Sequence, residues 1–377
     1  MKHSRPGELR ETSKAWLPAL AGLTVICLAT LPACVTAQQQ PGESSMKPRS
    51  HYTESGFRNR YPHPIKGAGD FMKFLADWAR QEVKTAEFPL ADNDPDFLKA
   101  NRAVPTLTWI GHATFLIQFD GLNILTDPHL TARASPVGFA GPKRFTEPGL
   151  PFEGLPPIDI VVISHNHYDH LDIDTVTRLV EMQPQSPPQF FVPLGLESWF
   201  HDLGIHSVTE MDWWQETDFR NDHGSARIGP LPVQHFSGRG IADRNDTLWA
   251  GWLLTIAGKK FFFAGDTGYS KDFADIHERH GDIDFALIPI GAYEPRSFMR
   301  PMHVDPEEAV QIFQDLHARQ AVGMHWGTFR LTLEDMDEPP RRLATALEAA
   351  GIHAERFFVM QHGETRRLDF LSESSPD

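Results

Sequence analysis

The chain of 377 residues carries a formal net charge of −15 and is 41% apolar, which suits one large globular domain or two modest ones. This acidity argues against nucleic acid as a partner and against purely electrostatic binding to anionic lipid. The two cysteines, Cys27 and Cys34, lie near the N-terminus. Disulfides, thiolate metal sites and cysteine nucleophiles are therefore excluded from the rest of the chain.

Residues 1–33 have the layout of a secretory signal, with a basic start followed by an apolar run at 15–33. The run ends in Leu31-Pro32-Ala33-Cys34, which resembles a bacterial lipobox with Cys34 as the lipid-carrying residue after cleavage. We therefore expect a lipoprotein of the bacterial cell envelope that faces the periplasm. The alternative is an uncleaved N-terminal membrane anchor, because about 18–20 apolar residues can also span a bilayer.

Residues 34–56 are rich in Gln, Ser, Pro and Gly and are predicted to be a flexible tether before one domain over 57–377. Apolar residues at helical spacing predict helices at 71–83, 172–182, 306–316 and from 341 to 350. Runs of apolar and β-branched residues predict strands at 106–110, 114–119, 122–126, 158–163, 190–193, 248–256, 260–264, 285–290, 320–324 and 356–360. The strands fall into two sets, each ending beside a helix, which indicates two mixed sheets packed face to face with helices outside.

A cluster of polar residues follows the predicted strand at 158–163. The motif His165-x-His167-x-Asp169-His170 places four potential metal ligands within six residues of the loop that leaves this strand. Neutral imidazoles and a carboxylate suit zinc or a similar first-row divalent ion. The alternative reading is a set of surface histidines in a polar turn.

Three further residues, His235, Asp266 and His325, each follow an apolar run at the end of a predicted strand. An isolated buried carboxylate is costly, which favours a cation beside Asp266. Each histidine taken singly is more often a satisfied core or rim residue. Together with the loop motif, however, the five histidines and two aspartates can supply two sets of ligands around two ions.

The order of these seven residues resembles the metallo-β-lactamase superfamily. Over about 57–358 the chain more narrowly resembles the N-acylphosphatidylethanolamine-hydrolysing phospholipase D family, through motifs at 109–114, 166–172, 265–269, 291–296, 303–309 and 325–329. The resemblance implies an α+β four-layer αββα sandwich, with the whole catalytic domain in 57–377. It also implies two zinc ions, or another first-row metal, held by His165, His167 and His235 and by Asp169, His170 and His325, with Asp266 bridging them.

In this reading a metal-bridging hydroxide attacks the phosphorus of N-acylphosphatidylethanolamine and yields phosphatidate and N-acylethanolamine. Asp169, besides binding metal, could orient the hydroxide or accept its proton. The family resemblance suggests that the His303 loop lies by the active site, and Tyr293 is a further catalytic candidate. His112 and Asp127 are candidates for holding ligand residues in place. A locally bonded capping loop for His303 and a backbone-bonded turn for His112 stay open as alternatives.

The sequence is compatible with more than one function. The same site would serve a metal-dependent lactonase or a general phosphodiesterase on a small soluble substrate, and a non-catalytic metal-binding envelope regulator is a second alternative. The family alone suggests a homodimer. Arg239 and Arg296 could bind phosphate or pair on the surface. The apolar pairs 199–200, 213–214 and 298–299 could receive acyl chains, although core packing is the expected role.

Overall fold

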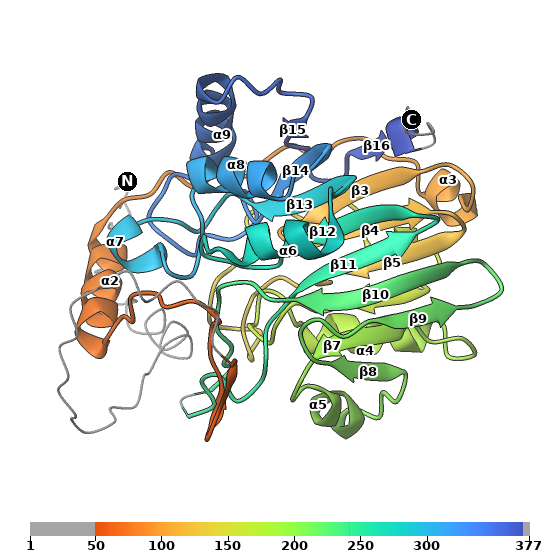
Figure 1. Ribbon diagram of the computed structural model, residues 1–377, viewed down its shortest axis with the longest axis horizontal. Helices are drawn as coiled ribbons and strands as arrows, with labels where there is room; N and C mark the ends of the chain where they lie inside the picture. Colours follow the sequence, from red (N-terminus) through yellow and green to blue (C-terminus); the bar gives the residue numbers. More distant parts are fainter. Residues whose placement is uncertain (1–49, 241, 372–377) are drawn as a thin grey trace, which may run out of the picture.

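The computed structural model describes residues 50–240 and 242–371 (Figure 1). The predicted export signal, the lipidation candidate Cys34 and most of the predicted tether lie outside these residues. The last residues of the range predicted as a tether form a small hairpin, in which β1 (Tyr52–Thr53) pairs with β2 (Gly56–Phe57). Among the described residues, no helix has the length and apolar character needed to cross a membrane.

Two seven-stranded sheets form the centre of the protein. The first sheet, in spatial order, consists of β16 (Thr365–Arg367), β3 (Thr106–Gly111), β4 (Thr114–Phe119), β5 (Leu122–Thr126), β6 (Ile160–Val162), β7 (Gln189–Pro193) and β8 (Val208–Met211). The second consists of β15 (Phe357–Phe358), β14 (Gln320–Met324), β13 (Phe285–Pro289), β12 (Lys259–Phe263), β11 (Gly251–Ile256), β10 (Ser225–Leu231) and β9 (Thr217–Arg220). Both sheets are mixed, since β5 to β8 and β12 to β15 run parallel and the remaining pairs run antiparallel.

The strands are nearly continuous apolar runs because both faces of each sheet are covered. In β4, Phe115 and Ile117 point into the core between the sheets, whereas Leu116 belongs to a separate cluster on the outer face of the first sheet. The same alternation in β6 sends Ile160 and Val162 inward and Val161 outward. The two sheets thus share one inner core and need helices outside.

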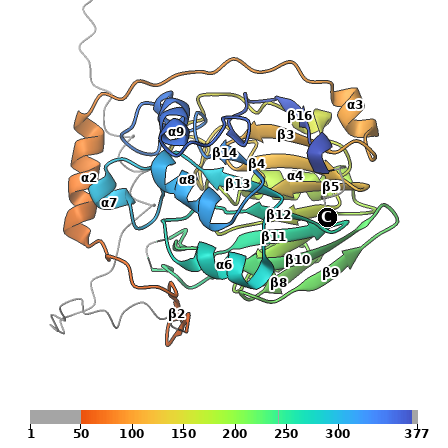
Figure 2. The ribbon, with the colours of Figure 1, turned by 45° about the horizontal axis from the view of Figure 1, so that its top comes forward.

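Helices cover both outer faces, as Figures 1 and 2 show. The first sheet packs against α3 (Pro95–Ala100), α4 (Ile173–Met182) and α5 (Glu197–Asp202), and the second against α6 (Asp272–His280), α8 (Pro306–Asp315) and α9 (Glu338–Ala349). Short 3-10 turns at Phe152–Gly154 and Asp369–Leu371 complete the elements. The predicted four-layer αββα sandwich is confirmed.

The predicted strands and helices are present, with ends that shift by up to three residues. The sequence did not predict α3, α5, α6, β8 to β10 or β16, because the apolar signal of these elements is weak. In β9, for example, exposed and half-buried residues alternate at the edge of the sheet, and α6 buries only one polar and two apolar side chains, Asp272, Phe273 and Ile276. The first predicted helix, α2, spans Ala68–Arg80 rather than 71–83.

The helix α2 packs on the short helix α7 (Arg296–Met299) rather than on the main core. The ring of Phe74 stacks on Phe298 at 5.1 Å, and Phe71 lies 6.4 Å from the same ring. These side chains form an apolar cluster of their own with Met299 and Leu333. The aromatic side chains of α2 are thus buried in a cluster separate from the main core.

Candidate metal centre

The seven residues predicted as metal ligands converge at one edge of the sandwich, where loops leave the carboxyl ends of the parallel strands. Four lie on the loop between β6 and α4, and the others follow β10, β12 and β14. His325 comes directly after β14, as expected. His235 does not end a strand, however, because β10 stops at Leu231 and three further residues precede His235.

His165, His167 and His235 form the first set of side chains. Nε2 of His165 lies 2.8 Å from Nδ1 of His167, and Nε2 of His235 lies 3.3 Å from the same Nδ1. All three are placed with Asp266 so that one potential ligand atom from each lies within 4.8 Å of the others. The three nitrogens therefore face one common point.

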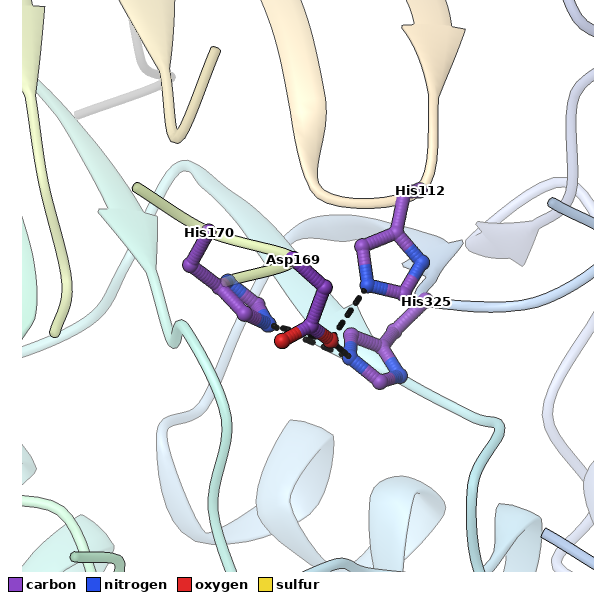
Figure 3. A group of neighbouring side chains, drawn as sticks. All are labelled: His112, Asp169, His170 and His325. Atoms are coloured by element: carbon purple, nitrogen blue, oxygen red, sulfur yellow. Dashed lines mark hydrogen bonds and ion pairs between the residues drawn. The ribbon is translucent and has the colours of Figure 1, made fainter. Parts of the chain in front are cut away.

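Asp169, His170 and His325 form the second set (Figure 3). The two Nε2 atoms of His170 and His325 are 3.2 Å apart, and Oδ2 of Asp169 lies 3.4 Å from each of them. Two ligands of a tetrahedral zinc ion, each about 2.0–2.1 Å from the metal, are about 3.3 Å apart. The spacing of this second set fits such an ion, and so does the distance from His235 to His167 in the first.

Asp266 lies between the two sets. Its Oδ2 is 3.1 Å from Nε2 of His170, and its Oδ1 is 3.1 Å from Nε2 of His325. The same Oδ2 is 3.9 Å from His165 and 3.8 Å from His235. One carboxylate thus reaches both sets, which is the position required of a bridging ligand.

The first set is made of neutral imidazoles. Burial lowers the pKa of His167 and of His235 to about 3, and burial together with neighbouring imidazoles holds the pKa of His165 well below its usual range. At neutral pH these rings carry no charge and one nitrogen of each has a free lone pair. That is the form in which histidine binds a metal ion.

The second set concentrates negative charge. Burial opposes ionisation of Asp169 and Asp266, but the charge of His170 and hydrogen bonds from neighbouring histidines hold the pKa of both carboxyls well below the usual range. Burial would also lower the pKa of His325, yet Asp266 and the hydrogen bond with Asp169 raise it to about 9. The pKa of His170 is raised for the same reasons. The two carboxylates are therefore stable only with positive charge beside them. Protons on His170 and His325 supply that charge, and a divalent cation would supply it in their place.

Buried partners fix the orientation of the imidazole rings. The Nδ1–H of His170 donates to Oδ2 of Asp127 at 2.6 Å, and the Nδ1–H of His235 donates to the carbonyl of Met302 at 2.9 Å. Ser164 Oγ donates to Asp127 at 2.5 Å and lies 2.8 Å from Nδ1 of His165. In each ring the other nitrogen, Nε2, is thereby turned toward the site. The structure places Asp127 behind the ligand loop, where the prediction put it.

His112 contacts the second set from the β3–β4 turn, where its backbone is in the left-handed region at φ 53°. Its Nε2–H donates to Oδ2 of Asp169 at 2.9 Å, and its carbonyl accepts from the backbone N–H of His325 at 3.0 Å. The ring itself lies 3.9 Å from that of His325. His112 thus contacts two members of the set, and Figure 3 shows its bond to Asp169. The alternative of a turn histidine bonded only to backbone is therefore wrong.

Asn59 has a role that the sequence did not reveal. This side chain, only 5% exposed, clamps both backbone groups of His235: Nδ2 donates to its carbonyl at 2.8 Å, and Oδ1 accepts from its N–H at 3.0 Å. Oδ1 also accepts from the indole of Trp249 at 3.1 Å. The clamp comes from a segment 176 positions earlier in the chain, so no local pattern indicates it.

His303 lies beside the cluster, whereas Tyr293 does not. Nε2 of His303 is 3.9 Å from Oδ2 of Asp266, and Arg296 donates to the His303 carbonyl at 2.7 Å. Tyr293 is fully buried, and its hydroxyl donates to Glu338 on α9 at 2.8 Å. The structure therefore turns this hydroxyl away from the site, and Tyr293 is withdrawn as a catalytic candidate.

The two arginines considered for phosphate binding brace loops instead. Arg296 pairs with Asp305 and Glu308 besides holding His303. Arg239 donates to the carbonyls of Asn166 and Leu171 at 2.9 and 2.7 Å and stacks on Tyr168, so it stabilises the ligand loop from below.

An open cleft of about 930 Å³, solvent included, lies over the cluster. Its floor includes His167, Asp169, Asp266 and His303. Its walls are mainly apolar and include Phe71, Phe74, Trp78, Phe236, Phe298, Met299 and Met302. Phe298 and Met299 line the cleft and are also packed in the buried cluster with α2, so the expected packing is present but outside the main core. Phe200 and Trp213 are core residues as expected, and Trp199 and Trp214 pack against the core while partly exposed.

Comparisons with known proteins agree with this geometry. A family model described as the beta-lactamase superfamily domain matches residues 122–326. The N-acyl-phosphatidylethanolamine-hydrolyzing phospholipase D 1 of Caenorhabditis elegans is 43% identical over 249 residues, which cover 64% of this chain and 69% of that protein. The mitochondrial N-acyl-phosphatidylethanolamine-hydrolyzing phospholipase D of Saccharomyces cerevisiae is 37% identical over 272 residues, which cover 70% of this chain and 56% of that protein.

Solved structures share the fold. A metallo hydrolase from the archaeon Ignicoccus hospitalis superposes with a TM-score of 0.52 at 24% identity, covering 70% of this chain and 98% of that one. An isothiocyanate hydrolase from Delia radicum gut bacteria gives a TM-score of 0.53 at 21% identity over the same shares.

The Asn59 clamp generates a prediction for the first set. Asn59→Ala leaves the buried N–H and carbonyl of His235 unpaired, so we expect a loss of about 2–4 kcal/mol in stability and a 10–100-fold weaker metal affinity. Metal content after dialysis against graded free zinc measures the second effect. Asn123→Ala is the matched control, since Asn123 is also buried and bonds to the remote Gln118 and Pro157. Equal metal loss in both variants would show that the clamp is merely structural.

Proposed function

Since the chain belongs to the beta-lactamase superfamily and is a metal-dependent hydrolase, we propose that it is a zinc-dependent phosphodiesterase that hydrolyses N-acylphosphatidylethanolamine. The products are phosphatidate and N-acylethanolamine. The observation that carries the proposal is the position of an apolar cleft directly over a two-set cluster of potential metal ligands. Two relatives whose names state this activity support the substrate.

The residues present fit two divalent ions. His165, His167 and His235 would hold one ion, and Asp169, His170 and His325 the other, with Asp266 shared between them. A pair of bound ions lowers the pKa of a water molecule and neutralises charge that develops on phosphoryl oxygens. Zinc is our assignment because imidazole nitrogens are the majority of the potential ligands in both sets.

Side chains of this chain position the reacting groups. Asp169 faces the cleft, and a hydrogen bond from His112 holds its carboxylate in place. We therefore assign Asp169 to orient the attacking water or to accept the proton of that water. His303 lines the same floor, and burial lowers its pKa to about 3, so its ring is neutral at pH 7. A neutral imidazole there can hydrogen-bond to the oxygen of the leaving N-acylethanolamine. The bond from phosphorus to that oxygen breaks as the bond to water oxygen forms.

The walls of the cleft suit acyl chains. Phe74, Trp78 and Phe298 come from the cluster that α2 and α7 form outside the main core. Each methylene buried there would contribute about 0.8 kcal/mol of binding free energy. Arg330 also lines the cleft, held over the Trp78 ring at 4.5 Å, and brings positive charge to a strongly acidic protein. The combination suits a lipid with a phosphate group.

The rim of the cleft offers a route for a substrate that resides in a membrane. The segment 131–146 contains no acidic residue, and its Ala134 and Pro142 line the cleft. In the same segment Phe139 is 83% exposed, an unusual state for a phenylalanine. We infer that this rim meets the bilayer, and that the predicted export signal and a lipid on Cys34 keep the enzyme at the cell envelope.

The shared carboxylate supplies a direct test of the metal mechanism. Asp266→Asn should lower turnover of an activated phosphodiester by at least about 100-fold, and a chelator should abolish it, because both remove the cation that activates water. Asp159→Asn is the control, since Asp159 is a buried carboxylate that pairs with Arg102 far from the cluster. Full activity in Asp266→Asn or in excess chelator would refute the mechanism.

The substrate is tested by product analysis. The purified protein should release N-acylethanolamine and phosphatidate from N-acylphosphatidylethanolamine in mixed detergent micelles, measured by mass spectrometry. A panel of lactones and small soluble phosphodiesters runs beside it. Turnover of the panel without release of N-acylethanolamine would establish the lactonase or general phosphodiesterase instead.

The cleft wall is tested by acyl-chain dependence. Phe298→Ala should raise KM for a long-chain substrate by about tenfold and leave a short-chain analogue nearly unchanged, because only the long chain reaches the wall. Phe200→Ala removes an equally large ring from the remote outer cluster and controls for lost stability. A shift of the same size for both chain lengths would contradict the assignment of the wall to acyl chains.

A further inference from the structure

A second group of potential metal ligands lies away from the catalytic cluster. It consists of His277, Asp282 and His317, and their ligand atoms lie within 4.8 Å of one another. None of them belongs to the sets described above or lines the cleft. The catalytic site therefore does not account for the trio.

The topology of the second sheet brings the trio together. His277 lies on the last turn of α6, and Asp282 comes three residues before β13. His317 comes three residues before β14, and the parallel register pairs Phe285 with Gln320 at the start of these two strands. The group thus lies at the amino ends of the strands, the edge opposite the loops that carry the catalytic residues.

The geometry of the trio is that of two imidazoles converging on one carboxylate oxygen. Oδ1 of Asp282 is 2.9 Å from Nε2 of His277 and 3.6 Å from Nδ1 of His317. The two rings stack with centroids 3.8 Å apart and an angle of 20° between their planes. The two nitrogen-to-oxygen distances lie on either side of about 3.3 Å, the separation between two ligands of a tetrahedral zinc ion.

The backbone holds His317 in an unfavourable conformation. Its φ is 47°, in the left-handed region that glycine normally occupies after the end of a helix, here α8. A side chain at such a position costs about 1 kcal/mol relative to glycine. Histidine stands here although glycine would be more stable, and its imidazole faces Asp282. This indicates that the His317 side chain has a function besides ending the helix.

The exposure of the trio suits an ion that keeps water ligands. The side chains are 29%, 77% and 59% exposed for His277, Asp282 and His317, so three protein ligands leave the outer positions of an ion open to solvent. Two imidazoles with one carboxylate favour zinc, nickel or copper over magnesium or calcium. We propose that these three residues form a separate surface site for a first-row divalent cation, which ties the end of α6 to the turn after α8.

Metal content measured on the full holoenzyme tests this site. Wild type, His317→Gly and His277→Gln are dialysed against graded free Zn²⁺, and bound zinc per chain is measured by mass spectrometry. His317→Gly keeps the left-handed turn and removes the ligand, so it should fold at least as well as wild type. We expect both variants to bind one ion fewer per chain at saturation of the wild type, with affinity for that ion at least about tenfold weaker.

The comparison does not depend on how many ions the catalytic cluster holds, because every variant retains that cluster. Hydrolysis of an activated phosphodiester should stay unchanged in both variants. Added Zn²⁺ should raise the Tm of wild type whose catalytic cluster is already filled, because it then binds the trio. It should not raise the Tm of the two variants. His201→Ala is the control, since the ring of His201 lies 5.1 Å from that of another surface histidine, His206, and His201 belongs to none of these ligand groups.

Two results would overturn the proposal. Equal zinc content in wild type and both variants would show that the trio is only a hydrogen-bonded ion pair. A loss of one ion in His201→Ala as well would show that exposed histidines bind zinc without a built site. Loss of one ion in His317→Gly and His277→Gln alone, with activity retained, supports the site.

Discussion

Two carboxylates that lie among buried imidazoles set the constraint on which the active edge of this protein depends. Asp266 is buried and Asp169 is partly buried at the floor of the cleft, and both lie among imidazoles, where uncompensated negative charge is costly. Protons on His170 and His325 balance that charge in the absence of a cation, and divalent ions would balance it better. The surrounding structure fixes the nitrogens and oxygens so that the cation is the partner they fit.

The sandwich meets this constraint through its topology. The parallel halves of both sheets end at one edge, so loops from strands far apart in the chain can deliver ligands to one point. The same topology leaves the opposite edge free for a group with a different task, the trio of His277, Asp282 and His317. A large apolar core between the sheets makes both edges rigid, because a close-packed interior resists small displacements.

The parts of the site differ in where they originate. The ligand loops belong to the shared fold of metal-dependent hydrolases, whereas the apolar wall comes from α2 and α7, which pack on each other outside the main core. A wall built from a separate cluster can change without disturbing the ligands. In the proposed function, reaction chemistry and substrate choice are therefore carried by different elements. Asn59 links the N-terminal segment to His235.

The sequence by itself determined the sandwich, most strands and the seven residues of the cluster, because apolar periodicity and the dense motif at 165–170 are local signals. Only the tertiary structure decided which way side chains point. Tyr293 turns to Glu338, the stripe of α2 becomes a cleft wall, and Asn59 reaches a residue 176 positions away. These outcomes depend on long-range packing, because buried polar groups form hydrogen bonds with partners far apart in the chain. No local sequence pattern specifies which partners they are.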